Sequence, residues 1–165
     1  MTLPTYVAGL PAELAVFVLA MTPLVEMQAA IPAGILVYGM PAWEAYLIAL
    51  LGNIVPTFLV YGLGQWWIEW TERRKGWLHR ITDVVLRRAH DKLHAKVSKA
   101  GLVALTVFVA LPFPGAGVWT GSVGAFLIGI PFRTALPYII AGNVINGLLV
   151  TLATTGTVAF FRFFL

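Results

Sequence analysis

The chain has 165 residues, of which 59% are hydrophobic and only 11% are charged. A soluble domain carries about 25% charged residues, so the composition excludes an ordinary soluble domain. It indicates an all-α integral membrane protein, a single membrane domain over residues 1–165. The absence of cysteine excludes disulfides, thiolate metal sites and cysteine nucleophiles.

Six apolar segments follow one another along the chain. A transmembrane helix needs about 20 apolar residues, and only the third and the sixth segments reach that length comfortably. The other four are too short to span a bilayer without help. The segments cover residues 7–22, 27–40, 42–65, 101–112, 116–130 and 133–159.

Each pair of short segments is joined by a proline-bearing break, at Thr22-Pro23 in the first pair and at residues 111–115 in the second. Proline removes a backbone donor and disfavours helical geometry at the residue before it. We therefore predict two re-entrant helical hairpins, each followed by one transmembrane helix. Six short helices in a thin or tilted arrangement remain the alternative.

Glycine, proline and asparagine, which a generic apolar helix does not require, recur at positions 90 residues apart. The pattern predicts two repeats, over about 7–65 and about 100–159, joined by a connector at about 66–99. A re-entrant hairpin returns to its own side, so one crossing separates the repeats and the second is inverted, as in many secondary transporters. The matching pairs are Gly34 and Gly124, Gly39 and Gly129, Pro41 and Pro131, and Gly52-Asn53 and Gly142-Asn143.

The connector holds nine of the eleven Lys and Arg residues, all within 73–99. The positive-inside rule places it in the cytoplasm, which predicts a multi-pass protein of the inner (cytoplasmic) membrane with both termini outside. Trp66, Trp67 and Trp70 suit an interfacial aromatic belt. Residues 77–99 have the pattern of a basic amphipathic helix that lies on anionic lipid, and we do not expect nucleic acid as a partner.

Glu26 is the only acid near either break, and a carboxylate at membrane depth indicates a functional site. A carboxylate removed from water holds its proton more tightly, which makes Glu26 the candidate for proton coupling. The alternative is structural: Glu26 accepts backbone N–H bonds at a helix N-terminus within the break, which stabilises its charged form.

The candidate substrate-binding residues lie at the two breaks and within the spans. Glycines allow close backbone approach, and helix N-termini at a cavity form anion sites, although tight packing explains the same glycines. Asparagines in spans also serve as interhelical hydrogen-bonding groups. Arg133 could pair with Glu26, bind phosphate, or extend to the interface. The set is Gln28, Pro32, Asn53, Pro114, Gly115, Gly117, Thr120, Arg133 and Asn143.

Nothing in the sequence predicts an enzyme, a metal site or a cofactor. His90 and His94 share one helical face, but the glutamate that follows the first histidine in zinc proteases is missing and no third ligand is evident. No nucleophile elbow, phosphate-binding loop or dinucleotide fingerprint occurs.

Two motifs resemble those of a known family. The run Glu26-Met27-Gln28-Ala29-Ala30-Ile31-Pro32 resembles the Glu-Leu-Arg-Gly-Ala-Ile-Pro element of the small multidrug export family. The stretch from Leu111 to Gly121 is similar to that family's Pro-x-Pro-Gly-Thr-Gly-Ala-Trp-Thr-Gly element, and the similarity covers roughly residues 13–155.

The family is in turn distantly similar to the DedA (SNARE-associated, VTT) superfamily, which includes polyprenyl-phosphate and phospholipid translocases with paired re-entrant hairpins. The chain departs from these patterns twice. Gln28 replaces the usual family arginine, and the second hairpin lacks the arginine of DedA proteins. A phosphate-lipid substrate would then depend on Arg133.

Together these features predict a membrane transporter, proton-coupled through Glu26. Its substrate would be an amphiphilic, lipid-linked (polyprenyl-phosphate-like) or small drug-like molecule that passes between the two hairpins. The alternative is a non-transporting membrane organiser that docks lipid or a partner. Membrane lipids are expected partners, and the small size favours a homodimer.

Overall fold

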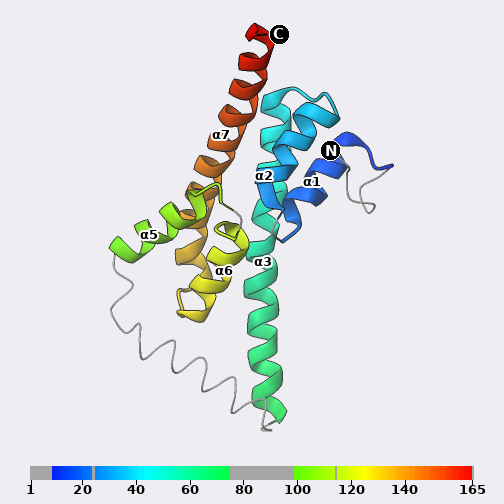
Figure 1. Cartoon of the computed structure of the whole chain (residues 1–165). Coiled ribbons are helices and arrows are strands. Elements are labelled where there is room, and N and C mark those ends of the chain that lie inside the picture. Colours follow the sequence, from blue (N-terminus) through cyan, green and yellow to red (C-terminus); the bar gives the residue numbers. More distant parts are fainter. Residues whose placement is uncertain (1–8, 24, 75–98, 114, 165) are drawn as a thin grey trace.

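The computed structural model describes residues 9–23, 25–74, 99–113 and 115–164, and Figure 1 shows their arrangement. The basic helix predicted over 77–99, with His90 and His94, lies almost wholly outside the described residues. The elements are α1 (Ala12–Met21), α2 (Glu26–Pro32) with its π-helical continuation η2 (Ala33–Val37), α3 (Ala42–Arg74), α5 (Lys99–Ala110), α6 (Val118–Leu127) and α7 (Phe132–Phe164).

Two helices, α3 and α7, are much longer than the rest. Stretches of each are long and apolar enough to cross a membrane, namely Ala42–Thr71 and Phe132–Thr157. Within the described parts of the chain, this confirms the prediction that only the third and sixth apolar segments have the length of a span. The two helices run in opposite directions, α3 downward and α7 upward in Figure 1.

The short helices pack around these two long ones. Helix α1 packs against α3 and α5 against α7, each within its own half of the chain. The second short helix of each half also reaches the long helix of the other half, because α6 contacts α3 and α2 contacts α7. The halves are thus interlocked through α2 and α6.

The local structure of the two halves agrees at positions 90 apart. Helices α3 and α7 are 33 residues each and begin at equivalent positions. Each follows a glycine in the left-handed region, Gly39 with φ +67° and Gly129 with φ +79°. Residues 41–60 and 131–150 alternate between buried and exposed in almost the same order. The two halves therefore have the same local structure at equivalent positions.

Two local predictions need correction. Helix α3 extends beyond the predicted end at residue 65 to Arg74, because residues 65–74 contain no glycine or proline to end it. The three tryptophans therefore lie within α3. Proline disfavours a continuous helix, so the sequence also suggests a break at Pro32, but Pro32 lies inside a helix. The next turn is the π-helix η2, in which the N–H of Tyr38 donates to the carbonyl of Ala33, five residues before it.

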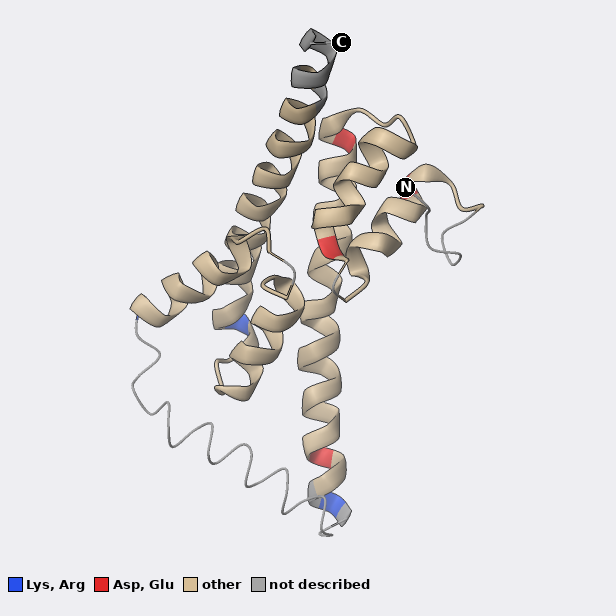
Figure 2. Cartoon of the chain, in the orientation of Figure 1, with Lys and Arg blue, Asp and Glu red and all other residues tan. Residues whose placement is uncertain are grey.

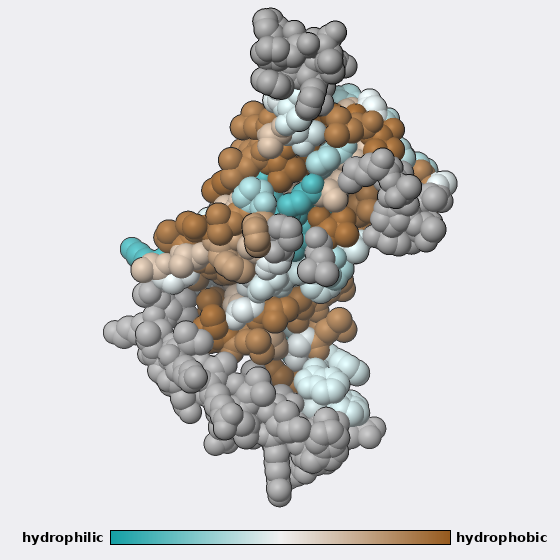
Figure 3. Space-filling model, in the orientation of Figure 1, coloured by the Kyte–Doolittle hydropathy of each residue, from teal (hydrophilic) through white to brown (hydrophobic). Residues whose placement is uncertain are grey.

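Each half has its own apolar core. One cluster joins α1, α2, η2 and the first part of α3 with Val150 of α7, and the other joins α5, α6 and the first part of α7 with Tyr61 of α3. The described residues on the face in Figure 3 are mostly apolar, with a small hydrophilic group near the middle. Buried polar side chains join the two halves: Glu26 bonds to α6, Asn53 to Asn143, and Ser122 to Thr57. The candidate site lies there.

Candidate functional site

Glu26 lies at the contact between the two halves and is only 6% exposed. The backbone N–H of Val118 donates to its Oε2 atom at 3.2 Å, and that of Trp119 donates to Oε1 at 3.4 Å. The side chain of Asn53 is a further hydrogen-bonding partner. Val118 and Trp119 begin α6, so the carboxylate caps the N-terminus of a helix 92 residues further along the chain.

This arrangement stabilises a negative charge. Free N–H groups and the helix dipole favour an anion at a helix N-terminus, whereas burial favours the neutral acid. No ion pair between described residues involves Glu26, and Figure 2 shows how few charged residues the described chain carries. The N–H donors of α6 are therefore the main compensation for a buried charge.

The backbone around Glu26 is shaped for this contact. The turn after α1 is closed by the N–H of Glu26, which donates to the carbonyl of Thr22 at 3.1 Å. Glu26 has a φ of +42°, a left-handed conformation that costs a non-glycine residue about 1–2 kcal/mol. Such strain persists where the surroundings impose it, often at functional sites.

Gly117 provides the space for the carboxylate. A β-carbon at this position would overlap Oε2 of Glu26. Its φ of 177° is extended backbone that any residue adopts, so space, and not conformational freedom, requires glycine here. Gly115 differs: it is exposed, has a φ of +88° and no neighbour near its missing side chain. It shapes the turn before α6.

The two breaks also meet through Trp119. Its indole Nε1–H donates to the backbone carbonyl of Met21, the last residue of α1, at 2.9 Å. Glu26 of the first break thus binds the start of α6, and Trp119 of α6 binds the end of α1. Two hydrogen-bonding groups, one from each half, hold the breaks together.

Asparagines connect the long helices beside this contact. Asn53 is hydrogen-bonded to Asn143, its counterpart 90 positions later, through Nδ2 and Oδ1 at 2.8 Å. Asn143 also donates to the carbonyl of Leu50 at 3.3 Å. Asn146 donates to the carbonyls of Val109 and Leu111 at the end of α5. These side chains make the interhelical bonds that the sequence suggested as one alternative.

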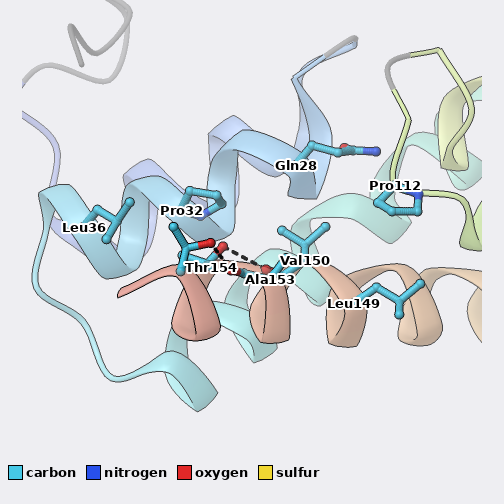
Figure 4. A pocket seen from close by; sticks show the side chains of 9 residues that line it. Gln28, Pro32, Leu36, Pro112, Leu149, Val150, Ala153 and Thr154 are labelled. Atoms are coloured by element: carbon cyan, nitrogen blue, oxygen red, sulfur yellow. Dashed lines mark hydrogen bonds between the residues drawn. The ribbon is translucent and has the colours of Figure 1, made fainter. Parts of the chain in front are cut away.

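A cavity of about 450 Å³ lies between α2, η2, the second break and the later part of α7. Figure 4 shows Gln28 and Pro32 on one wall, Thr154 on α7 and Pro112 from the second break. The Oε1 atom of Gln28 is buried and has no hydrogen-bonding partner. The remaining lining is mostly apolar: Leu36, Leu149, Val150, Ala153 and Thr157.

The structure thus separates the predicted site residues into groups. Gln28 and Pro32 line the cavity, while Asn53, Asn143 and Gly117 belong to the contact around Glu26. Thr120 and Arg133 are exposed, and Arg133 makes no ion pair with Glu26. Pro114 lies outside the described residues.

The anion site expected at the second break is already filled by a group of the protein itself. The N-terminal N–H groups of α6 bind the Glu26 carboxylate, so they are not free for a phosphate in this conformation. Neither Pro112 nor Thr154 was among the predicted site residues. Pro112 belongs to the predicted second break, and the signal for Thr154 is the run of threonines at 151, 154, 155 and 157 in an otherwise apolar helix.

Two apolar helices of spanning length, short helices broken between them and a buried acid at their contact define a helical membrane protein. The family model described as "Putative small multi-drug export protein" matches residues 26–149. The chain belongs to this family, which confirms the resemblance of the two motifs. No curated protein and no solved structure matches the chain.

Proposed function

We propose that the chain is a proton-coupled secondary exporter of an amphiphilic or lipid-linked small molecule. Family membership supports the transporter class. The opposite directions of α3 and α7 and the agreement of positions 90 apart support two inverted repeats, each with a re-entrant hairpin. In transporters of this type, discontinuous helices of the two repeats meet at the binding site.

The observation that carries the proposal is the contact between Glu26 and the N-terminus of α6. A charged carboxylate binds the two N–H groups of Val118 and Trp119. When Glu26 takes up a proton, the charge–dipole attraction is lost and one oxygen becomes a donor. The hold of the first break on α6 then weakens, and the two hairpins are free to separate.

The cavity lies next to this contact along the chain. Gln28 is two residues from Glu26, and Pro112 belongs to the break that leads into α6. A movement of the two breaks apart therefore changes the cavity walls. Proton uptake at Glu26 and substrate movement through the cavity would be coupled through α2 and α6. The basic residues 73–99 would face the cytoplasm.

Proteoliposomes with an imposed pH gradient test the proposal. Transport is followed with ethidium, with a fluorescent phospholipid and with the neutral dye N-phenyl-1-naphthylamine, and proton flux with an internal pH dye. We expect wild type to move at least one probe and to dissipate the gradient in its presence, and Glu26→Gln to do neither. Glu69→Gln is the matched control, because Glu69 is an exposed acid of α3.

Two outcomes would contradict the proposal. If Glu26→Gln moves the probe and protons like wild type, Glu26 is not the coupling group. If wild type moves none of the three probes under any gradient, the chain is better described as a non-transporting membrane organiser.

A further inference from the structure

We propose that the cavity beside Gln28 is a binding site for a neutral amphipathic molecule that carries a hydrogen-bond donor and enters from the lipid. The assignment rests on the proposed export function, because it names the class of molecule that would be exported. Its volume of about 450 Å³ falls within the range of small-molecule sites, about 300–1,000 Å³.

The unpaired polar atom at the cavity favours a ligand with a hydrogen-bond donor. The Oε1 atom of Gln28 is buried and accepts no hydrogen bond, which is costly for a polar group shielded from water. The hydroxyls of Thr154 and Thr157 donate to the carbonyls of Val150 and Ala153 at 2.8 and 2.7 Å. Their hydrogens are therefore already used within α7. The terminal amide of Gln28 can turn about its last side-chain torsion, which is broad. An N–H or O–H on the ligand would then satisfy its oxygen.

The surroundings argue against a charged ligand. None of the described residues that line the cavity is charged. Arg133 is 16 residues before Leu149 on the same helix, which places their backbones about 24 Å apart at 1.5 Å per residue. The N-terminus of α6 is bound by Glu26. An anion such as a lipid phosphate would therefore be buried without compensation, which is expensive.

The mouth of the cavity faces the apolar exterior. Leu36 and Leu149, on opposite walls in Figure 4, are 57% and 44% exposed. In a membrane, exposed leucines on the outer faces of η2 and α7 contact lipid. A molecule already dissolved in the bilayer can therefore reach Gln28 without crossing water.

A pair of probes tests the donor requirement. N-phenyl-1-naphthylamine is neutral, has one N–H and becomes fluorescent in apolar sites, and its N-methyl derivative lacks the N–H. With protein in nanodiscs and no pH gradient, we expect wild type to bind the first about tenfold more tightly, within the range for one buried hydrogen bond. Gln28→Leu should abolish this preference, and Gln65→Leu, at an exposed position of α3, should leave it unchanged.

A second variant tests the place of binding. Ala153→Phe fills the cavity and should remove saturable binding of both probes, whereas Ala141→Phe, at an exposed position of α7 outside the cavity, should not. Farnesol should displace the bound probe, and farnesyl phosphate should not. Circular dichroism confirms that each variant is folded.

The proposal is overturned if the two probes bind wild type equally, if Ala153→Phe binds like wild type, or if farnesyl phosphate competes as well as farnesol. Binding indistinguishable from protein-free nanodiscs would also overturn it. All of these binding measurements are made without a pH gradient, on variants that keep Glu26, so they do not depend on transport. Failure of this site and failure of the export function are therefore separate results.

Discussion

The two halves of the molecule share a backbone plan and differ in their chemistry. Both have a pair of short helices, a left-handed glycine two residues before a proline, and a 33-residue helix with a buried asparagine. The first break carries an acid, Glu26, and the second carries the helix N-terminus that binds it. The asymmetric pair, Glu26 and α6, therefore joins two halves whose local structures match.

The largest loss of stability should come from filling the space that Gly117 leaves for the Glu26 carboxylate. Gly117→Ala places a methyl group on the Glu26 carboxylate, and we expect a loss of about 3 kcal/mol, from overpacking together with weakened hydrogen bonds. Unfolding in SDS–detergent mixtures, followed by circular dichroism, measures it. Gly124→Ala on the same helix has nothing near its added methyl group and should be neutral or stabilising. Equal stability of the two variants would show that the contact is not tight.

An intermediate loss of stability should come from removing either asparagine of the pair that joins the halves. Asn53→Ala removes a donor from Asn143 and from Glu26, and we expect a loss of about 2 kcal/mol, because buried acceptors remain unpaired. Asn143→Ala should cost a similar amount. Since the two side chains share one bond, the double variant should lose less than the sum of the singles. Strict additivity would mean that the two side chains act independently.

The smallest loss of stability should come from substituting the glycine in each of the two equivalent turns. Gly39 and Gly129 occupy equivalent turns with positive φ. Alanine costs about 1–2 kcal/mol in this conformation, so the two substitutions should destabilise the protein by the same amount within about 0.5 kcal/mol. A large effect at one position and none at the other would break the structural equivalence of the halves. The same unfolding measurement provides the values.

Local signals in the sequence predicted much of the scaffold. Apolar length identified α3 and α7, and prolines identified the breaks at Thr22 and Pro112. The glycines and prolines 90 apart identified matching turns, because their backbone requirements are local. The end of α3 was misplaced, since charge suggested a connector where nothing terminates the helix.

The pairing of Glu26 with α6 could not be predicted from the sequence. It joins residues 92 positions apart, and no local pattern encodes which helix N-terminus a buried carboxylate will reach. The same contact removed the anion site that the glycines of the second break had suggested. The cavity was also missed in part, because Pro112 and Thr154 become neighbours of Gln28 only through the packing of α2 on α7.

The central claim is that the charge on Glu26 holds the first hairpin to α6. The chain lacks cysteine, so spin labels can be placed at Val37 on η2 and Val123 on α6, both exposed. Electron–electron distance measurements in nanodiscs then report their separation at pH 8 and pH 5. We expect one short distance at pH 8 and an added longer population at pH 5, with Glu26→Gln showing the longer population at both. Identical distributions at both pH values, unchanged in Glu26→Gln, would contradict the account.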